Sequence, residues 1–390
     1  MTKSHLKICH VASVDITLRF LLFSQLKYLQ DVGFEVWAIS SPGKWTKEIE
    51  DAGIRFQSIQ LRRKVFTPFE DFIALIQLFL LFRKEKFSLV HTHTLKASFL
   101  GQLAAFFAGV PARIYTIHGL DFQGVPVLWK RILFRFLERI IARIVDVAFS
   151  VNKEDIEMAL EKKIYPKEKL QYLPLGIDLT RFNPDRFSPE FCNKKKKELG
   201  MPLDARIIGI VARLVREKGY FELFEAFAQV LKQFPNTVLM VVGKEEPEKQ
   251  DSFSLQTEIR RYGIAKHVHF LGERTDVEEL YPLMDVFVLP TWREAIGISI
   301  LEASAMRRPV VATAIRGCRE AAEHGKTAIL VPPKNPQSLA RTVIAILSHP
   351  ELAKKMGEEA RKKVMREFNG EIIEKELKQE YDKLLAKYSR

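Results

Sequence analysis

Short apolar runs alternate with longer segments of helical periodicity along nearly the whole chain, and this alternation restricts the possible folds more than any other feature. In the first half it predicts buried strands at residues 6–11, 35–39, 56–59, 89–92, 113–116 and 147–150. Between them, apolar residues at helical spacing predict helices at residues 18–31, 69–84, 96–108 and 127–144. Strands and helices that alternate in this way form a doubly wound sheet of parallel strands.

The alternation stops at a polar stretch that ends in four consecutive lysines, Lys194 to Lys197, and then begins again. The second set of predicted strands comprises residues 207–211, 238–242, 268–271, 286–289, 310–312 and 329–331. A chain of 390 residues is also too long for one typical core. We therefore expect two Rossmann-like domains, residues 1–175 and 176–369, with a linker near residues 175–205. A charged amphipathic helix is expected at residues 370–390.

The formal charge of +13 predicts an anionic partner: a nucleic acid, an acidic lipid or a phosphorylated substrate. The sequence carries no aromatic and basic RNA-binding motif and no recognisable DNA-binding unit, which argues against a nucleic acid. Its three cysteines are isolated from one another, with no CxxC and no cysteine–histidine spacing of a metal site, so neither a disulfide framework nor a zinc site is predicted. A reducing cytosol is the expected location.

The first twenty residues read as the start of a strand and lack the long apolar core of a signal peptide. The most apolar run, residues 73–82, is about half as long as the ~20 residues that a spanning helix needs. We expect a protein that does not cross a membrane but is able to lie on one.

Two cations follow the first strand of the second half, in the segment GIVARLVREKG at residues 209–219. Ligands of parallel sheets bind at the carboxyl ends of the strands, and this segment lies between such an end and a helix. Arg213 offers a fork for phosphate oxygens, and Lys218 offers a point charge. Ordinary charges on a surface loop are the alternative interpretation.

Two glutamates lie at the start of a later helix, in the segment PTWREAIGISILEAS at residues 290–304. Glu294 is in the turn after a strand and Glu302 is about a turn and a half inside the helix, so both carboxylates can face one crevice unless they only mark a solvated face. The amino end of the helix is expected to present unpaired N–H groups at Ile296, Gly297 and Ile298. Carboxylates and N–H donors together suit a ligand that carries hydroxyls and phosphate.

Three other predicted strands end in residues that can approach a ligand. His118 comes directly after a strand and before a glycine; a lone histidine is often structural, but this one lies at a carboxyl end. Gly243 ends another strand. Gly272 and Arg274 follow a third, where glycine permits close approach and the arginine can stack on a base or simply be solvated.

The spacing of Glu294 and Glu302, together with the Arg213 and Lys218 pair and with His118, resembles the family-4 retaining glycosyltransferases, which use nucleotide sugars and have the GT-B architecture. The resemblance implies two Rossmann-like domains whose doubly wound parallel sheets face each other across a cleft. It also implies that the C-terminal helix packs back on the N-terminal domain.

The resemblance further assigns roles to the candidate residues. It implies that the diphosphate is bound by Arg213 and Lys218, the ribose by Glu302, and hydroxyls of the donor sugar by Glu294 and His118. The other nucleotide contacts that we expect are Gly243, Arg274 and the backbone at Ile296, Gly297 and Ile298. The turn at residues 12–17 departs from the family, because many relatives have paired glycines there. No Asp-x-Asp motif or carboxylate–histidine cluster is present, so we expect no metal and no cofactor besides the donor.

The predicted helix at residues 127–144 combines apolar positions with arginines that recur every four residues. Such a helix can rest on an anionic membrane, or it can face a core with a solvated basic edge. The arginines are Arg131, Arg135, Arg139 and Arg143. Residues 62–64, another basic run, could extend the same surface.

The expected function is therefore the transfer of a hexose or N-acetylhexosamine from a nucleoside-diphosphate sugar to a glycan or lipid-linked acceptor in bacterial surface polysaccharide or glycolipid synthesis. A UDP-linked donor is expected, with GDP and ADP left open. Two alternatives stay open: a nucleotide-sugar 2-epimerase of the same architecture, and a non-catalytic basic protein that binds membranes or nucleic acid.

Overall fold

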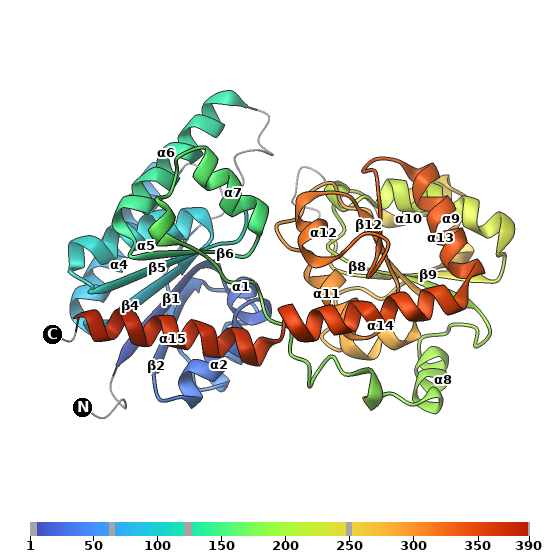
Figure 1. Cartoon of the computed structure of the whole chain (residues 1–390), viewed down its shortest axis with the longest axis horizontal. Coiled ribbons are helices and arrows are strands. Elements are labelled where there is room, and N and C mark those ends of the chain that lie inside the picture. The colour runs from blue at the N-terminus through green and yellow to red at the C-terminus, as the bar shows by residue number, and fades with distance from the viewer. Residues whose placement is uncertain (1–5, 62–66, 121–126, 247–251, 389–390) are drawn as a thin grey trace. The chain divides into compact units, whose positions relative to one another are not determined.

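The computed structural model describes residues 6–61, 67–120, 127–246 and 252–388. The chain divides into two compact units, and each has its own parallel sheet (Figure 1). Unit 1 consists of Met1–Gly176 and Gly370–Arg390, and unit 2 consists of Ile177–Asn369. The basic run at residues 62–64 lies outside the described residues.

The sheet of unit 1 has the strand order β3-β2-β1-β4-β5-β6-β7, and its described strands pair in parallel. These strands are β1 (Lys7–Val14), β2 (Glu35–Ser41), β3 (Arg55–Ser58), β4 (Leu89–His93), β5 (Ala112–Ile117), β6 (Val147–Ser150) and β7 (Leu170–Tyr172). The order reverses between β1 and β4, and the carboxyl ends beside such a point are where ligands of open α/β sheets bind. The strands β1 and β4 are almost completely buried, as expected for strands covered by helices on both faces.

The helices of unit 1 follow the predicted alternation, but two short helices at Thr46–Asp51 and Lys153–Glu161 were not predicted, and one predicted helix is divided. The helix expected at residues 18–31 is two helices, because the chain leaves helical geometry at Leu21 and Leu22. The longer helices of unit 1 are α1 (Asp15–Phe20), α2 (Phe23–Asp31), α3 (Thr46–Asp51), α4 (Pro68–Glu85), α5 (Leu95–Ala108), α6 (Leu128–Ile144), α7 (Lys153–Glu161) and α15 (Gly370–Tyr388).

The C-terminal helix α15 belongs to the core of unit 1. Figure 1 shows it lying along α2, and Ile373, Leu377 and Tyr381 share a buried cluster with Leu26 and Leu29 of that helix. The last helix of the chain therefore supplies side chains to the interior of a sheet that begins at residue 7.

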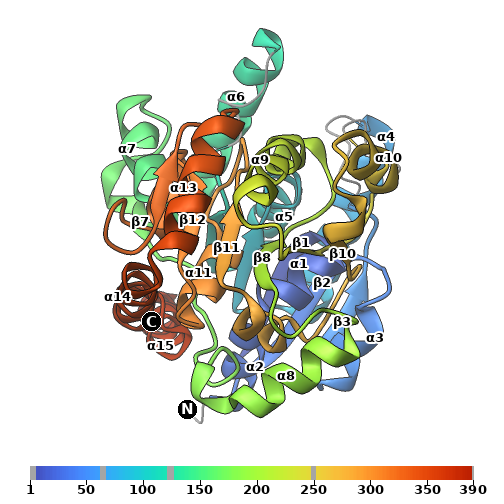
Figure 2. The ribbon, with the colours of Figure 1, turned by 90° about the vertical axis from the view of Figure 1, so that its right-hand side faces the viewer.

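The sheet of unit 2 has the strand order β10-β9-β8-β11-β12-β13, again in parallel pairs, and its order reverses between β8 and β11. The strands are β8 (Arg206–Val211), β9 (Thr237–Val242), β10 (Val268–Phe270), β11 (Val286–Leu289), β12 (Val310–Thr313) and β13 (Ile329–Val331). The longer helices are α8 (Pro189–Glu198), α9 (Tyr220–Gln233), α10 (Leu255–Arg261), α11 (Ile298–Ala305), α12 (Arg316–Ala321), α13 (Pro336–Ser348) and α14 (Pro350–Glu367). Helices α9 and α13 lie side by side over one face of the sheet (Figure 2).

The prediction of a linker near residues 175–205 is wrong in part, because this segment contains the helix α8. The Ser188 hydroxyl caps the helix by accepting from the N–H of Phe191, and Pro189 fits the first helical turn. Lys195, from the lysine run, forms ion pairs with Asp276 (3.0 Å) and Glu279 (2.5 Å). The lysines thus belong to a helix fastened to unit 2.

Candidate functional site

The loop after β8 carries both cations that were predicted to bind phosphate, and Gly219 holds this loop against the loop after β11. Gly219 has a φ of +75°, and a Cβ there would lie 2.0 Å from the carbonyl oxygen of Pro290. The N–H of Trp292 also donates to the carbonyl of Glu217, at 2.7 Å. Because β8 and β11 are neighbours at the point where the strand order reverses, the two loops meet at the edge where ligands bind.

This contact brings together two residues from the two predicted motifs. Lys218 is only 8% exposed, and its ammonium forms an ion pair with the carboxylate of Glu294. The backbone of Glu294 is held in turn by Gly317 of α12, where a Cβ would lie 2.5 Å from the Glu294 carbonyl oxygen. Gly317 was not predicted, since no local pattern connects it with residue 294.

Arg213 lies in the same loop, and its guanidinium is held by two carboxylates. It donates to Glu246 at 2.6 Å and to Glu217 at 3.2 Å, and its side chain is 37% exposed. Neither partner was predicted. The arginine is therefore positioned before any ligand arrives, and a phosphate group would compete with two carboxylates for it.

Glu302 lies inside α11 and accepts a hydrogen bond from the hydroxyl of Tyr281, at 2.6 Å. Burial raises the pKa of Glu302 to about 7, while the hydrogen bond and the nearby Arg181 oppose this rise. Arg181 is fixed by Glu278, at 2.7 Å. Tyr281 and Arg181 were missed by the sequence analysis, because both come from other parts of the chain.

The backbone at the amino end of α11 differs from the expectation. The N–H of Gly297 donates to the carbonyl of Gly317 at 3.3 Å, and that of Ile298 donates to Ile296 at 3.0 Å. Two of the three predicted N–H groups are thus already paired, since α12 packs against this end and the chain makes a tight turn there. A ligand would have to replace these bonds to use the two donors.

Gly243 and Arg274 also have partners that the sequence did not reveal. A Cβ on Gly243 would lie 1.9 Å from the carbonyl oxygen of Ala212, so this glycine lets the ends of β8 and β9 approach each other. Arg274 donates to both oxygens of Asp276, at 2.8 and 2.5 Å. This planar pair occupies the edge of the guanidinium, and stacking of its face on a base stays a prediction.

His118 belongs to unit 1 and follows β5, as expected. Its Nε2 lies 3.1 Å from Nδ1 of His93, and its Nδ1 has no hydrogen-bond partner within the described residues. Burial lowers the pKa of His118 to about 4, so its ring is neutral near pH 7. His93 was missed, although the alternation in His91-Thr92-His93 places both histidines on one face of β4.

A cavity of about 520 Å³ opens beside the carboxyl ends of β1 and β4 in unit 1. Polar groups of Ser13, Thr94 and Lys96 line one part of it. Asp71, which pairs with Lys96 at 2.6 Å, also lines it. Apolar residues of α5 and α6 form another wall: Leu95, Phe99, Leu100, Leu133, Phe134 and Leu137.

The first half of α6 exposes large apolar side chains together with arginines. Leu128, Trp129, Ile132 and Phe136 are each 57–68% exposed. Phe134, in contrast, packs against a buried core cluster, and Ile141 and Ala142 further along the helix are buried. The helix therefore has a core-facing side and an exposed apolar side, and its contact with a membrane stays a prediction. In the described parts of the chain, no helix has both the length and the hydropathy needed to span a bilayer.

Two parallel-sheet α/β domains define the architectural class of this protein, and the cations and carboxylates that meet at a strand edge are typical of enzymes with phosphorylated substrates. The chain belongs to the glycosyltransferases. The family model described as Glycosyl transferases group 1 matches residues 192–363, and the model described as Glycosyl transferase 4-like matches residues 7–151. The predicted membership in the glycosyltransferases is confirmed, and retention of configuration stays a prediction.

Two curated relatives and one solved structure illustrate the similarity. The capsular polysaccharide biosynthesis glycosyltransferase CapM of Staphylococcus aureus is 28% identical over 386 residues, 97% of each chain. The UDP-Gal:alpha-D-GlcNAc-diphosphoundecaprenol alpha-1,3-galactosyltransferase of Escherichia coli is 28% identical over 321 residues, 81% of each chain. HepE from Anabaena, solved with UDP and glucose, has a TM-score of 0.83 at 20% identity and covers 97% of this chain and 100% of its own. This likeness confirms the GT-B fold.

Proposed function

We propose that this glycosyltransferase moves a hexose or N-acetylhexosamine from a UDP-linked donor, with retention of configuration, to a glycan or lipid-linked acceptor in bacterial surface polysaccharide or glycolipid synthesis. The observation that carries the proposal is the convergence of Lys218 with Glu294 in unit 2, at the strand edge that also holds Arg213. The names of the two relatives, one capsular and one acting on a diphosphoundecaprenol acceptor, support the substrate class.

The donor is assigned to unit 2 by the chemistry of its groups. Arg213 and Lys218 bind the diphosphate, and Glu302 accepts hydrogen bonds from the ribose hydroxyls. Glu294 accepts from hydroxyls of the donor sugar, with Lys218 holding its carboxylate in place. Nucleotide contacts at Gly243, Arg274 and residues 296–298 complete the assignment, where the ligand replaces the hydrogen bonds that the N–H groups of Gly297 and Ile298 make in the structure. His118 of unit 1 binds a sugar hydroxyl.

The reaction breaks the bond between the anomeric carbon and the diphosphate oxygen and forms a bond from that carbon to the acceptor oxygen, on the same face. The proton of the acceptor hydroxyl passes to the departing phosphate. Fixed positive charge at Arg213 and Lys218 stabilises the charge that develops on this leaving group. We assign Glu294 to binding rather than nucleophilic attack, since its ion pair with Lys218 makes it a poorer nucleophile.

Unit 1 is the proposed acceptor side. Its cavity joins polar groups at strand ends to an apolar wall, which suits a sugar attached to a lipid. The exposed apolar residues of α6 and its arginines Arg131, Arg135, Arg139 and Arg143 suit an anionic membrane. We therefore place the protein in the cytoplasm at the inner face of the plasma membrane, and its three free cysteines agree with a reducing compartment.

The test is a thermal-shift screen of UDP-, GDP- and ADP-linked sugars, because a ligand that binds the native state raises its apparent stability. We expect the largest shift with a UDP-sugar and its loss in Arg213→Ala and in Glu302→Ala. The matched control is Lys363→Ala, which removes a lysine of the same 8% exposure that is paired with Glu367 of α14. If the donor causes the same thermal shift in both site variants as in the unmodified protein, the assignment of Arg213 and Glu302 to the donor site is wrong.

Product analysis by mass spectrometry separates transfer from epimerisation. Incubation with donor alone should leave the nucleotide sugar intact, whereas an epimerised nucleotide sugar would favour the 2-epimerase. We also propose that transfer needs no metal, since the two cations supply positive charge at the leaving group. Activity should then persist in excess EDTA, and its restoration only by Mg²⁺ or Mn²⁺ would contradict the proposal.

A further inference from the structure

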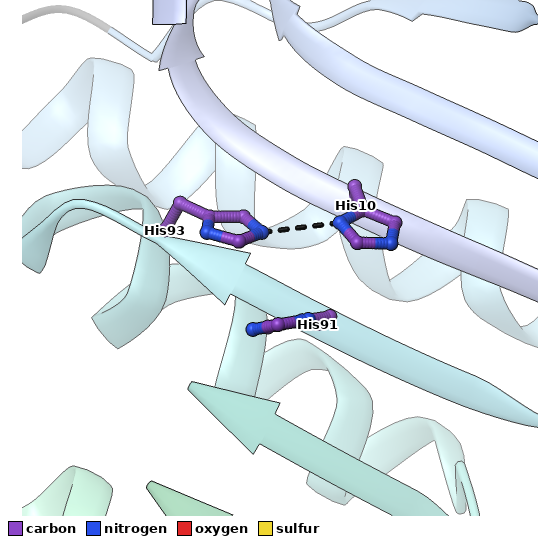
Figure 3. Close-up of side chains that lie close together, drawn as sticks. All are labelled: His10, His91 and His93. Carbon is purple, nitrogen blue, oxygen red and sulfur yellow. Dashed lines mark hydrogen bonds between the residues drawn. The ribbon is translucent and has the colours of Figure 1, made fainter. Parts of the chain in front are cut away.

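The buried histidines of unit 1 form a cluster whose ring nitrogens are already in use. His10 of β1 and His91 of β4 are register partners, and His93 lies two residues further along the same face of β4 (Figure 3). His10 is hydrogen-bonded to His93 at 3.1 Å, and the Tyr381 hydroxyl bridges His91 (2.6 Å) and His10 (3.2 Å). Burial lowers the pKa of all three rings, to about 3 for His10, so they are neutral near pH 7. One nitrogen of each ring lies within 4.8 Å of the other two, but a metal ion would have to break the bond between His10 and His93 to bind there.

A groove of about 900 Å³ beside the end of α6 is, in contrast, open and basic. Two elements supply its cations: Arg139 and Arg143 on α6, and Lys163, Lys167 and Lys169 in the segment between α7 and β7. The described residues that line the groove include no carboxylate. Five like charges around one groove repel one another, and an anion bound between them would relieve this repulsion.

Backbone carbonyls hold two of these cations in place. The ammonium of Lys169 donates to three carbonyl oxygens at the carboxyl end of α6, at 2.7–3.2 Å. A cation is favoured there, because the last carbonyls of a helix lack partners within the helix. The guanidinium of Arg139 donates to the carbonyl of Lys162, at 3.3 Å. Both cations are therefore positioned at the groove by groups that carry no negative charge.

The acidic residues around the groove do not line it. Asp146 accepts from the N–H of Arg113 at 2.9 Å, and Glu161 is paired with Lys162 at 2.6 Å. Glu168 is exposed and is not among the lining residues. Within the part of the chain that the structure describes, none of the five cations of the groove forms an ion pair. The groove thus differs from the strand edge of unit 2, where the cations are already paired.

The groove and the candidate site lie at opposite edges of the sheet of unit 1. Helix α6 ends at Ile144, shortly before β6 begins, and Lys169 directly precedes β7, so the groove adjoins the amino ends of these two strands. His118 follows β5, which pairs in parallel with β6, and therefore lies at the carboxyl edge. A strand such as β6 spans about 13 Å, which separates the groove from the proposed acceptor side.

One exposed face of α6 joins the groove to an apolar surface. Its residues recur every three or four positions, which is the spacing of a single helical face: Leu128, Ile132, Phe136, Arg139 and Arg143. The face changes from apolar to cationic between Phe136 and Arg139, a rise of about 4.5 Å along the helix axis. A bilayer leaflet changes in the same way, from acyl chains to phosphate headgroups. The match favours a lipid over a soluble phosphate, which would leave the apolar half of the face uncovered.

We propose that the groove binds the phosphates of an anionic phospholipid headgroup, while the acyl chains lie along the apolar half of α6. Cations from two elements fit a headgroup with two phosphates, one contacted from α6 and the other from residues 163–169. This lipid is not the acceptor, because the groove lies at the opposite edge of the sheet from the proposed acceptor side. The lipid as the source of phosphate rests on the membrane contact in the proposed function, whereas the phosphate site itself does not.

Vesicle flotation of the full chain, without any nucleotide sugar, tests the site. Vesicles of phosphatidylcholine carry either phosphatidylglycerol, which has one phosphate, or cardiolipin, which has two, at equal total charge. We expect tighter binding to cardiolipin, because a groove with fixed cations responds to how the phosphates are joined, whereas a diffuse basic surface responds only to charge density. The measurement needs no transfer of sugar, so a failure of the proposed function would leave its result standing.

A pair of double variants locates the binding. Lys163→Gln with Lys167→Gln removes two exposed cations of the groove and should weaken binding to cardiolipin vesicles about 30-fold, with loss of the preference over phosphatidylglycerol. The matched control is Lys354→Gln with Lys355→Gln, two exposed lysines of α14, which changes the net charge equally and should leave binding nearly unchanged. Phe136→Ser should weaken binding to both kinds of vesicle by about 10-fold, since an apolar contact with the acyl chains is lost. Melting curves show that each variant is folded.

The opposite results would overturn the proposal. Equal binding to the two kinds of anionic vesicle, or equal losses in the two double variants, would show a basic surface without a site. Inorganic phosphate separates the two sources of phosphate, since it has no acyl chain. If it raises the melting temperature of the unmodified protein but not of the groove variant, and no preference for cardiolipin is seen, the groove binds a soluble phosphate and the lipid is wrong. Unchanged vesicle binding in Phe136→Ser would contradict the acyl-chain contact.

Discussion

In unit 2 the candidate groups are charged and already paired, as Lys218 is with Glu294 and Arg213 with Glu246. In unit 1, β1, β4 and the residue after β5 instead carry neutral histidines that are linked to one another and, through Tyr381, to the last helix. Ion pairs hold cations ready for another anion, and neutral donors and acceptors suit hydroxyl groups. The difference teaches that the two units offer different chemistry, with charged groups at the strand edge of unit 2 and neutral donors and acceptors in unit 1.

The largest expected effect comes from removing a charged group of unit 2. Lys218→Ala should lower kcat by about 10²- to 10³-fold, because a fixed cation at the leaving group is lost. Lys363→Ala, which also removes a buried paired lysine, should keep nearly full activity. Steady-state transfer assays check both variants, with melting curves to show that each is folded. Equal losses in the two variants would assign the effect to stability.

A second prediction concerns the apolar and basic surface of unit 1. Replacing Arg131, Arg135 and Arg139 with glutamate should weaken binding to anionic vesicles by about 100-fold or more, since each basic residue near such a surface contributes about 1 kcal/mol. The control replaces Lys354, Lys355 and Lys362 of α14 with glutamate, which changes the net charge by the same amount. Vesicle co-sedimentation measures both. If binding is unchanged, or falls equally in the two sets, a soluble acceptor is preferred.

The contact between the two loops of unit 2 gives a third prediction. Gly219→Ala should lower the free energy of unfolding by about 3 kcal/mol, from left-handed strain plus contact with the Pro290 carbonyl. Gly200→Ala has a similar φ of +68° but meets nothing within 4 Å, so it should cost only about 1 kcal/mol. Denaturant unfolding compares them. Similar costs would show that the close approach to Pro290 is not important.

The smallest effect is a pH dependence at Glu302, whose pKa is raised to about 7. Ribose hydroxyls need the ionised carboxylate, so UDP affinity should fall by up to about 10-fold per pH unit below 7. In the absence of ligand, the raised pKa of Glu302 makes the free energy of unfolding change in the opposite direction. This free energy falls as the pH rises from 4.5 to about 7, because the carboxyl ionises first in the unfolded chain. Calorimetry of UDP binding between pH 5.5 and 8 tests this, and Glu302→Gln should abolish the dependence.

Much of the fold was predictable because its elements follow local periodicity. The strands at residues 147–150, 286–289 and 329–331 have the predicted bounds, and the last helix ends at Tyr388 within its predicted range. The split between α1 and α2, the helices α3, α7 and α8 and the strand β7 were missed. The lysines of α8 look like a polar linker until their pairing with Asp276 and Glu279, about eighty residues later, is seen.

The candidate site was predictable as a set of chemical groups. Arg213, Lys218, Glu294 and Glu302 were named from their spacing and from the resemblance to a family. Their partners were not, since Glu246, Gly317 and Tyr281 lie in other segments. The donors at Gly297 and Ile298 were expected to be unpaired, and packing against α12 together with a tight turn pairs them instead.

The sequence by itself determined the alternation of strands and helices and the kinds of groups that end the strands, because periodicity and residue type are local properties. The tertiary structure alone decided that Lys218 lies against Glu294 and that Tyr381 joins His91 to His10. Such pairings depend on the register of distant strands and on the close approach that a glycine permits. Neither is encoded in any short stretch of the chain.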